Sequence, residues 1–512
     1  MRRATLAVLS VLAPAAAAAQ VDVALSGAVS SDLRYRAQEE RVHDDASGEL
    51  LLDKTFERNE NRVSTRLTLA IGHKAQGVGE VEFVWLGFSD VGRLDDLTLA
   101  ERVDPFWIEA HAAYLEVYDL LPALDLRVGR QVVQWGTADQ FNPTHNLNAL
   151  DLYDPLRFGL LMPNQMVRAD WHPRDLFTLT AAWVPVFRPA RLPPTAVIGL
   201  RSTERIPIQD AEFRHSVAAL SGLAPPGELD VRPVLPEATL DNSQAGARLA
   251  TRLGLFDVSG SYTIGRDDMP QPYLSDGRDA PGETRVRLMY PRVQVVGADL
   301  AASLPWLADL GVWAEGAVFF PQRVTMSVLT PQGEAKVNPD GGFCSNDPLV
   351  LLVAPSQGVN AAECRPGARD PLIVDDEPFV RWTVGTDYSL TSQLYANAQW
   401  VHGFVDEFGV GQDVRVAASR PEDEHTLRRQ GDYVVAGVDH RSFSDTLLLR
   451  VFGIAGLRDP RSYVVFPQVV WSVADGAELT LGAFVMLGDF DSKFGDPAAG
   501  GTVVFTKAKV YF

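Results

Sequence analysis

The stretch Thr502-Val-Val-Phe-Thr-Lys-Ala-Lys-Val-Tyr-Phe512 decides the fold class. One side of its two-residue period carries Val504, Thr506, Ala508, Val510 and Phe512, and the other carries Lys507 and Lys509. This alternation predicts a β-strand with an apolar and a charged face, because a helix would mix the two sets. Its length and pattern match a strand that crosses an outer membrane. A single strand in lipid leaves backbone groups unpaired, so the stretch predicts a closed barrel.

The N-terminus predicts a secretory signal peptide over residues 1–19. Arg2 and Arg3 precede an apolar run from Ala4 to Ala13, and an alanine tract follows Pro14. These are the charged, apolar and small-residue sections of such a peptide, with cleavage expected after Ala19. The run is shorter than the roughly 20 apolar residues of a membrane-spanning helix, which disfavours a retained anchor.

Composition narrows the class of the remaining chain, residues 20–512. The mean hydropathy is −0.03, which a helical membrane protein does not show but a barrel with a polar lumen does. The 512 residues carry a formal charge of −20, which becomes −22 once the two signal arginines leave. This acidic excess argues against a nucleic-acid partner. No composition shift marks a domain boundary.

Short segments of alternating apolar and polar residues recur between Gly-, Asp- and Pro-rich stretches, as in an all-β chain. We predict a single transmembrane up-and-down antiparallel β-barrel of about 18 strands, with 16 as the alternative. The predicted strands are residues 21–35, 61–73, 78–87, 107–118, 123–136, 160–172, 176–187, 244–254, 256–266, 285–304, 309–320, 378–390, 393–403, 432–443, 446–457, 462–473, 478–488 and 502–512.

The connections between these strands alternate in length, with the longest near residues 188–243 and 321–377. Such alternation is typical of a barrel with short periplasmic turns and long extracellular loops. It predicts that both termini are periplasmic. The first strand begins directly after the predicted cleavage site, so we expect no N-terminal plug domain.

Strand parity predicts which charged residues face the lumen. Arg62 and Arg66, for example, lie opposite Val63, Leu67 and Leu69, and an arginine facing lipid at the midplane costs roughly 2–4 kcal/mol. The predicted pore-lining residues are Arg62, Arg66, Arg168, Asp170, Arg248, Arg252, Arg381, Asp387, Lys507 and Lys509. Two interpretations remain open: an anion-selective track, or charges paired with acidic neighbours such as Glu80, Glu82 and Glu315.

One stretch stands out for its residue choice. Arg127-Val-Gly-Arg-Gln-Val-Val-Gln-Trp-Gly136 leads into a segment with Asn142, Pro143, Asp154 and Pro155. Gly136, Pro143 and Pro155 end the strand and stiffen the loop after it. The segment is a candidate constriction loop folded into the pore, and packing on the rim is the alternative. The strand resembles the Gly-Arg-Gln strand of alginate-export-like and related porin-like barrels of Gram-negative outer membranes, and the terminal strand ends on an aromatic residue as theirs do. The resemblance implies a barrel and no particular substrate.

The loops carry three further features. The two cysteines, Cys344 and Cys364, lie in one loop, and the oxidising compartment predicts a disulfide between them. Residues 38–60 hold eight acidic and three basic side chains, without the ligand spacing of a specific metal site. Residues 210–220 have apolar side chains at the spacing of a short helix. Residues 348–355 are apolar, and they either cap the pore or pack between loops.

These features predict a porin-like channel in the outer membrane, which passes small solutes through a charged aqueous lumen. Its expected surroundings are membrane lipid and lipopolysaccharide, with barrel-assembly machinery as a partner. The scattered histidines form no catalytic pattern, so we predict no enzyme and no cofactor. The alternatives are a channel for a more hydrophobic solute through the apolar loop cap, an outer-membrane hydrolase, and a structural barrel.

Overall fold

The computed structural model describes residues 21–41, 50–173, 176–196, 229–276, 284–322, 324–325, 327–330, 333–337, 343–357, 361–364, 372–374, 378–404, 431–457, 462–488 and 492–512. The predicted signal peptide and the helix expected at 210–220 lie outside these ranges. Among the described residues, no helix combines the length and the apolar character needed to cross a membrane.

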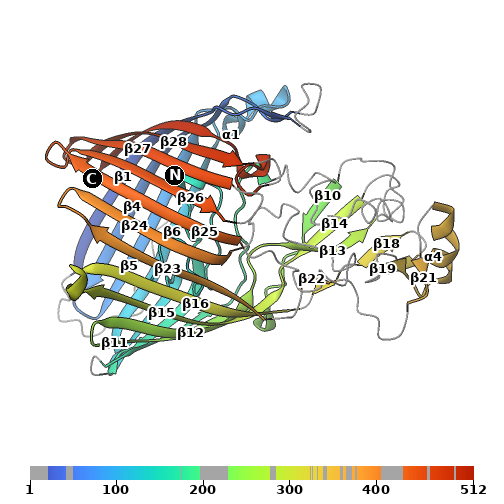
Figure 1. Cartoon of the computed structure of the whole chain (residues 1–512), viewed down its shortest axis with the longest axis horizontal. Coiled ribbons are helices and arrows are strands. Elements are labelled where there is room, and N and C mark those ends of the chain that lie inside the picture. Colours follow the sequence, from blue (N-terminus) through green and yellow to red (C-terminus); the bar gives the residue numbers. More distant parts are fainter. Residues whose placement is uncertain are drawn as a thin grey trace, which may run out of the picture.

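Eighteen antiparallel strands form one closed sheet (Figure 1), which confirms the predicted barrel and strand number. In chain order they are β1 (Val21–Arg36), β4 (Phe56–Ile71), β5 (Ala75–Leu86), β6 (Phe106–Leu121), β7 (Leu124–Gln131), β8 (Asn164–Trp171), β9 (Thr178–Val184), β11 (Gln244–Leu253), β12 (Phe256–Arg266), β15 (Arg292–Leu304), β16 (Leu310–Pro321), β23 (Phe379–Ser389), β24 (Leu394–Phe404), β25 (Gly431–Ser442), β26 (Leu447–Gly456), β27 (Ser462–Ala474), β28 (Ala477–Gly488) and β29 (Val503–Tyr511). Each strand pairs with its neighbour in the chain, and β29 closes the barrel on β1.

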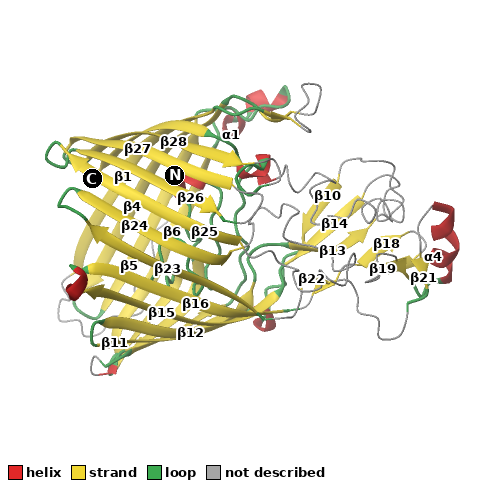
Figure 2. Cartoon of the chain, viewed as in Figure 1, coloured by secondary structure: helices red, strands yellow, loops and turns green. Residues whose placement is uncertain are grey.

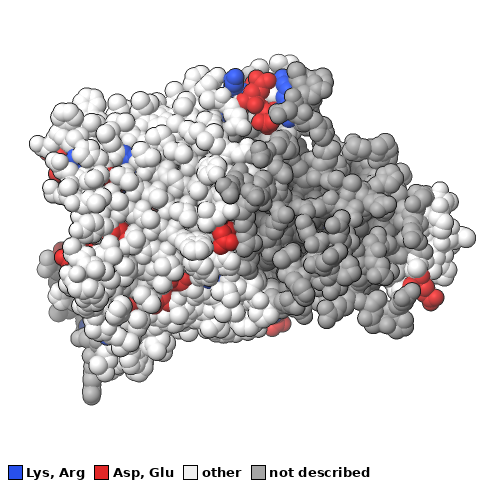
Figure 3. All heavy atoms as spheres, viewed as in Figure 1, with Lys and Arg blue, Asp and Glu red and all other residues white. Residues whose placement is uncertain are grey.

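The wall has an apolar outer face and a mixed, largely polar inner face. On β1, Val23 and Leu25 are each 64% exposed, whereas Asp32 and Arg34 are buried on the other side of the strand. On the face seen in Figure 3, the barrel wall is almost free of charged side chains. An apolar outer band is what lipid requires of such a wall.

Both ends of the described chain lie at the barrel end that carries the short turns. Val21 pairs with Ile71 beside the 72–74 turn, and Tyr511 bonds to Gly476 in the 475–476 turn. The long connections all leave from the opposite end, toward the right of Figures 1 and 2. The predicted alternation of short and long links is therefore present.

Three strand predictions were wrong in extent. The strand predicted at 285–304 is two strands, β14 (Thr284–Met289) and β15, because Pro291 between them has no backbone N–H for a ladder. The strands predicted at 123–136 and 160–172 are shorter, since β7 ends at Gln131 and β8 begins at Asn164. The connection between them is correspondingly longer than expected.

Beyond the long-connection end lies a second, mixed sheet of seven short strands, which the sequence did not indicate. Three successive long connections contribute to it. Its strands are β10 (Leu229–Pro233), β14, β13 (Gln271–Asp276), β18 (Ser327–Thr330), β19 (Gly333–Val337), β20 (Phe343–Cys344) and β21 (Ala361–Ala362).

The predicted disulfide is confirmed in this second sheet. Cys344 and Cys364 are bonded to each other, with their Cα atoms 4.7 Å apart. Closing such a loop constrains the unfolded chain by roughly 3 kcal/mol. The apolar helix α4 (Pro348–Val353) lies at the far tip of the sheet, away from the barrel end (Figure 2).

The remaining described elements are short. They are the strand pairs β2 (Glu40–Arg41) with β3 (Leu50–Leu52) and β17 (Val324–Thr325) with β22 (Leu372–Val374), the helix α1 (Ala100–Val103), and the 3₁₀ helices η2 (Asp95–Thr98), η3 (Pro155–Arg157), η5 (Leu240–Asn242), η6 (Pro305–Leu307), η7 (Ala354–Gln357) and η9 (Pro497–Ala499).

Candidate functional site

The connection between β7 and β8, residues 132–163, folds into the barrel, and we call it the inward segment. Its side chains and backbone contact strands from around the wall: β1, β4, β8, β9, β16, β23, β24 and β25. A segment that touches such widely separated strands of a closed barrel lies in its lumen. It therefore narrows the lumen.

A buried asparagine, Asn148, forms hydrogen bonds with both ends of the inward segment. The Asn148 carbonyl oxygen accepts a hydrogen bond from the backbone N–H of Val133 (2.9 Å). Its amide nitrogen donates to the backbone oxygens of Gln131 (3.2 Å) and Met162 (2.9 Å). Beside this tie, Trp135 packs in a buried apolar cluster on β8 and β9. The segment therefore has its own internal structure as it enters the lumen.

Glu315 on β16 anchors the middle of the segment. Its carboxylate accepts five hydrogen bonds, from the backbone N–H groups of Thr137, Ala138 and Thr144 (2.9, 3.0 and 2.9 Å), the Thr144 hydroxyl (2.7 Å) and the Asn142 amide (3.1 Å). Glu315 is only 3% exposed. Hydrogen bonds to an ionised acceptor are the strong ones, so this one side chain holds the segment against the wall.

Two polar side chains and an apolar cluster fix the neighbouring part of the segment. The Thr383 hydroxyl on β23 donates to the backbone oxygen of Phe141 (2.9 Å), and the Gln399 amide on β24 donates to that of Asp139 (2.9 Å). The Phe141 ring packs in a buried cluster with Val401 and other residues of β24 and β25. The segment thus crosses from one side of the lumen to the other.

Asp154 anchors the far end of the segment to β1 and β4. Arg34 binds both of its carboxylate oxygens, at 2.6 and 2.9 Å, and the Arg58 guanidinium lies 2.9 Å away. Arg34 also pairs with Asp32 (2.5 Å). The four side chains are at most 8% exposed. The pKa of Asp154 is held well below its usual range: burial alone would raise it, but bonding to Arg34 and the Arg58 charge outweigh burial.

The other residues expected to form a constriction lie in the same segment. Gly136 has a φ of +95°, and a Cβ atom there would sit 2.4 Å from both Glu315 carboxylate oxygens. Pro143 accepts a hydrogen bond from the Asn146 amide through its backbone oxygen (2.8 Å). Pro155 opens η3, which Asp154 caps by accepting from Leu156 N–H (3.0 Å). Only glycine fits at position 136, because it needs both the positive φ and the close carboxylate.

The arginines predicted on β4 are each beside acidic side chains. Arg62 contacts Glu60 (2.5 Å) and Glu82 (2.7 Å), and Arg66 contacts Glu80 (2.9 Å). The Arg62 pairs are mostly buried, whereas Arg66 is about half exposed. These contacts correspond to charges paired with acidic neighbours, which is one of the two interpretations that the strand pattern allowed for the lumen arginines.

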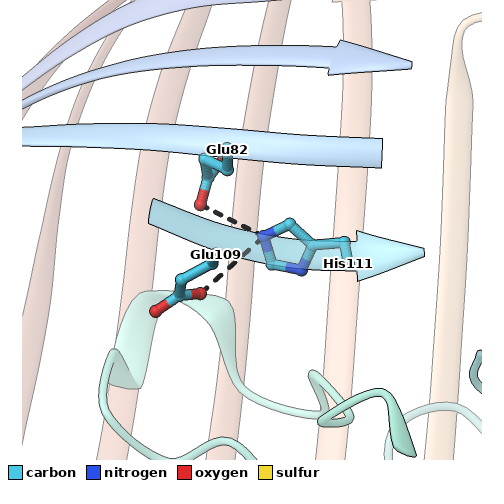
Figure 4. A group of neighbouring side chains, drawn as sticks. All are labelled: Glu82, Glu109 and His111. Atoms are coloured by element: carbon cyan, nitrogen blue, oxygen red, sulfur yellow. Dashed lines mark hydrogen bonds and ion pairs between the residues drawn. The ribbon is translucent and has the colours of Figure 1, made fainter. Parts of the chain in front are cut away.

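Glu82, Glu109 and His111 form a cluster with the composition of a metal site (Figure 4). His111, the extra residue at a bulge in β6, places its Nε2 3.3 Å from Glu82 and 3.8 Å from Glu109. Arginines, however, already bind both carboxylates, Arg62 at Glu82 and Arg191 at Glu109. A metal ion would have to displace two guanidinium groups, so we assign the cluster to the ion-pair network of the wall.

The remaining predicted wall residues also have neighbours of complementary chemistry. The ion pairs are Arg168 with Asp170 (2.8 Å), Arg248 with Asp299 (3.4 Å) and Arg252 with Asp257 (3.8 Å). Arg381 lies over the Phe319 ring, 4.6 Å from its centroid, and Asp387 accepts a hydrogen bond from Tyr395 (3.1 Å). Paired arginines contribute little net charge to a passing ion.

Lys507 and Lys509 differ from these arginines. Within the part of the chain that the structure describes, neither ammonium has a carboxylate within 4.0 Å. Lys509 lies over the Tyr511 ring, 4.2 Å from its centroid. Both lysines line a cavity of about 630 Å³ between the inward segment and the inner face of β24 to β29. Their positive charges face this space.

His145 gives the inward segment a dependence on pH. Its Nδ1 accepts a hydrogen bond from the backbone N–H of Trp135 (3.3 Å), and its Nε2 has no partner among the described residues. Burial lowers the pKa of His145 to about 4, from 6.5. The folded segment therefore takes up a proton less readily than the released one.

We expect acidification to loosen the segment. Because the folded pKa is depressed, the stability is complete above pH 6.5 and is lost as the pH falls toward 4, by about 2 kcal/mol at pH 5. Single-channel conductance should become larger and noisier at pH 5 than at pH 7.5, and His145→Asn, which retains an acceptor for Trp135, should respond much less. His73→Asn in the exposed 72–74 turn is the control. Equal pH responses in the wild type and His145→Asn would contradict the assignment.

Several anchors of the segment were not identified from the sequence: Glu315 as a hydrogen-bond acceptor, Thr383, Gln399, and the pairing of Arg34 and Arg58 with Asp154. Parity places all of these side chains on the inner face. No local signal connects them to the segment, because their partners lie up to 260 residues away.

The chain is similar to one protein family and to several solved outer-membrane barrels. A model of the family described as "Protein of unknown function (DUF1302)" matches residues 113–402. Among solved structures, Acinetobacter baumannii OccAB1 is 8% identical (TM-score 0.46, 96% of each chain covered). Vibrio cholerae OmpT is 11% identical (TM-score 0.38, 96% of this chain and 98% of that one), and the A. baumannii outer-membrane channel DcaP is 10% identical (0.37, 98% and 100%). No curated protein matches. The family model matches more than half of the residues of this chain. The chain therefore belongs to the DUF1302 family of proteins of unknown function.

Proposed function

We propose that the protein is a porin-like channel of the outer membrane, which passes small solutes through its lumen. The observation that carries this proposal is the course of the 630 Å³ cavity along the wall. On β28 its lining runs from Glu478 to Met486, about 26 Å along the strand. An apolar band of about 25 Å crosses the membrane in such barrels. The cavity thus extends along most of the length that a solute has to cross.

The proposal implies that the short turns and both termini lie on the periplasmic side and the second sheet outside the cell. Lipid and lipopolysaccharide would surround the wall, and barrel-assembly machinery would insert it. Stepwise current in KCl across a planar bilayer, from refolded chain lacking residues 1–19, tests the channel role. Folded barrel that adds no current steps would reject it.

We expect the current to be carried more by chloride than by potassium. Lys507 and Lys509 face the cavity without ion pairs in the described part of the chain, and fixed charge in a narrow aqueous pore acts over a Debye length of about 8 Å at physiological salt. Reversal potentials across a KCl gradient should shift toward cation preference in Lys507→Gln/Lys509→Gln.

Two other variants show where the selective charge lies. Lys74→Gln, in the exposed 72–74 turn, removes a charge outside the cavity and should leave the reversal potential nearly unchanged. Arg248→Glu/Arg252→Glu should shift it less than the lysine variant does, because these arginines are paired and do not line the cavity. A cation-selective wild type, or a larger shift in the arginine variant, would contradict the expectation.

A further inference from the structure

The inner face of β27 to β29 carries an aromatic patch. Phe466, Phe484 and Phe505 all line the cavity. The ring centroid of Phe466 lies 5.6 Å from that of Phe484 and 5.8 Å from that of Phe505. The lumen of a membrane barrel is ordinarily polar, so three neighbouring phenylalanines beside a water-accessible space call for an explanation.

The backbone opposite the patch makes room for one of these rings. Gly482 on β28 is the register partner of Phe505. A Cβ atom at Gly482 would sit 2.6 Å from the Phe505 ring, so the ring occupies space that any other residue would fill. The ring is thereby held close to the wall, and the cavity in front of the patch stays open.

The unpaired positive charges lie next to this patch. Phe505, Lys507 and Lys509 alternate along β29 and share its inner face, at steps of about 7 Å. A ligand with an apolar body on the rings could therefore place one anionic group at either ammonium. A lysine ammonium is a compact charge on a flexible stem, which suits a single small anionic group.

Five carboxylates also face the cavity, and three of them are paired with arginines. Arg34 binds Asp32 (2.5 Å), and Arg450 binds Asp439 (2.5 Å). Glu478 accepts a hydrogen bond from Tyr511 (3.2 Å), and Asp139 lies across the cavity beside Asn397 (3.4 Å). Asp154 belongs to the network with Arg34 and Arg58 described above. On the inner face of β29, beside the aromatic patch, Lys507 and Lys509 therefore have no ion pair among the described residues.

We propose that this cavity binds an amphipathic organic monoanion, with its carboxylate at Lys507 and Lys509 and its aromatic or aliphatic body on the three phenylalanines. This inference rests on the proposed channel function and names the class of solute. The volume of about 630 Å³ lies within the range of small-molecule sites, roughly 300–1,000 Å³.

A series of four probes tests the chemistry by calorimetric titration of the detergent-solubilised protein. The probe is 3-phenylpropanoate; propanoate has the charge without the ring, 3-phenylpropanol the ring without the charge, and 3-phenylpropylammonium the opposite charge. We expect 3-phenylpropanoate to bind at least about tenfold more tightly than each of the others, since each lacks or reverses one element of recognition.

Variants locate the site. Lys507→Gln/Lys509→Gln and Phe466→Ala should each weaken 3-phenylpropanoate binding about tenfold. Lys74→Gln in the turn and Phe83→Ala on the outer face of β5 are the matched controls and should leave it unchanged. Retention of the compact SDS-resistant form shows that each variant is folded. If a variant does not fold, the wild-type probe series alone decides.

The outcomes separate this inference from the channel proposal. If the protein conducts KCl but binds 3-phenylpropylammonium as tightly as 3-phenylpropanoate, or shows no saturable binding of 3-phenylpropanoate, the inference is overturned. The channel proposal is unaffected by that result. Unchanged affinity in the folded lysine variant also overturns it. Selective binding that disappears in the lysine and Phe466 variants supports the inference whatever the KCl current shows, whereas absence of current rejects the channel role alone.

Discussion

Replacing Glu315 by alanine is expected to raise the single-channel conductance several-fold while the barrel stays folded. The substitution removes the acceptor of five hydrogen bonds and leaves three backbone N–H groups of the inward segment without their partner. Each lost bond to a charged group is worth about 1.5–3 kcal/mol, although such losses do not add fully. Docking of the segment should weaken by several kcal/mol, whereas the strand ladders of the wall do not depend on this carboxylate.

The test compares Glu315→Ala with Glu80→Ala in planar bilayers. Glu80 is also an acidic residue of the inner face, but its ion pair is with the half-exposed Arg66 of the neighbouring strand rather than with the segment. Gly136→Ala disrupts the same contact by a change in the segment rather than in the wall, because the added Cβ atom would collide with the Glu315 carboxylate. Both Glu315→Ala and Gly136→Ala should open the pore, and Glu80→Ala should not. Wild-type conductance in folded Glu315→Ala would show that the other anchors suffice.

The wall of the barrel could be predicted well because lipid imposes a strict local rule. On β1 and β29, apolar residues must alternate with lumen residues at every second position, and the rule can be followed in a single stretch of sequence. The closing pair sets Lys507 opposite Asp32 and Phe505 opposite Arg34. Parity assigns these side chains to the inner face, but it does not say which of them bond.

The interior of the barrel could be predicted only in outline. Gly136, Pro143 and Pro155 lie between β7 and β8, but β7 already ends at Gln131, five residues before the glycine that was expected to end it. The course of the segment depends on partners distant in the chain, such as Glu315, 178 residues from Thr137. Nothing in the local pattern around either residue encodes that meeting.

The second sheet was missed for a related reason. Its strands are two to six residues long and come from three separate connections. Some of its pairs, such as β10 with β14 and β13 with β18, are parallel pairs between different connections. Strands this short have too few residues to show an alternation, and a hairpin turn joins only antiparallel neighbours.

Replacing Asp154 by asparagine is expected to release the far end of the inward segment. The substitution leaves Arg34 and Arg58 buried with one carboxylate fewer, and breaking a buried ion pair by removing one partner costs about 3–5 kcal/mol. Asp32 at Arg34 and Glu60 at Arg58 (3.5 Å) offset part of this loss. The expected result is a larger, noisier conductance and faster proteolysis within the segment at neutral pH.

Asp439→Asn is the matched control, because Asp439 also faces the cavity and pairs with an arginine. Arg450 is 45% exposed, and such a pair contributes at most about 1 kcal/mol.

The pH dependence separates Asp154 from His145. With its pKa held well below the usual range, Asp154 contributes stability above pH 4 that is lost only in stronger acid, whereas the His145 effect is already present at pH 5. At pH 5 the wild type should therefore loosen by the His145 contribution while the Asp154 contribution is still present, and Asp154→Asn should be looser at both pH values. If Asp154→Asn matches the wild type at pH 7.5, the ion pairs with Arg34 and Arg58 do not hold the segment.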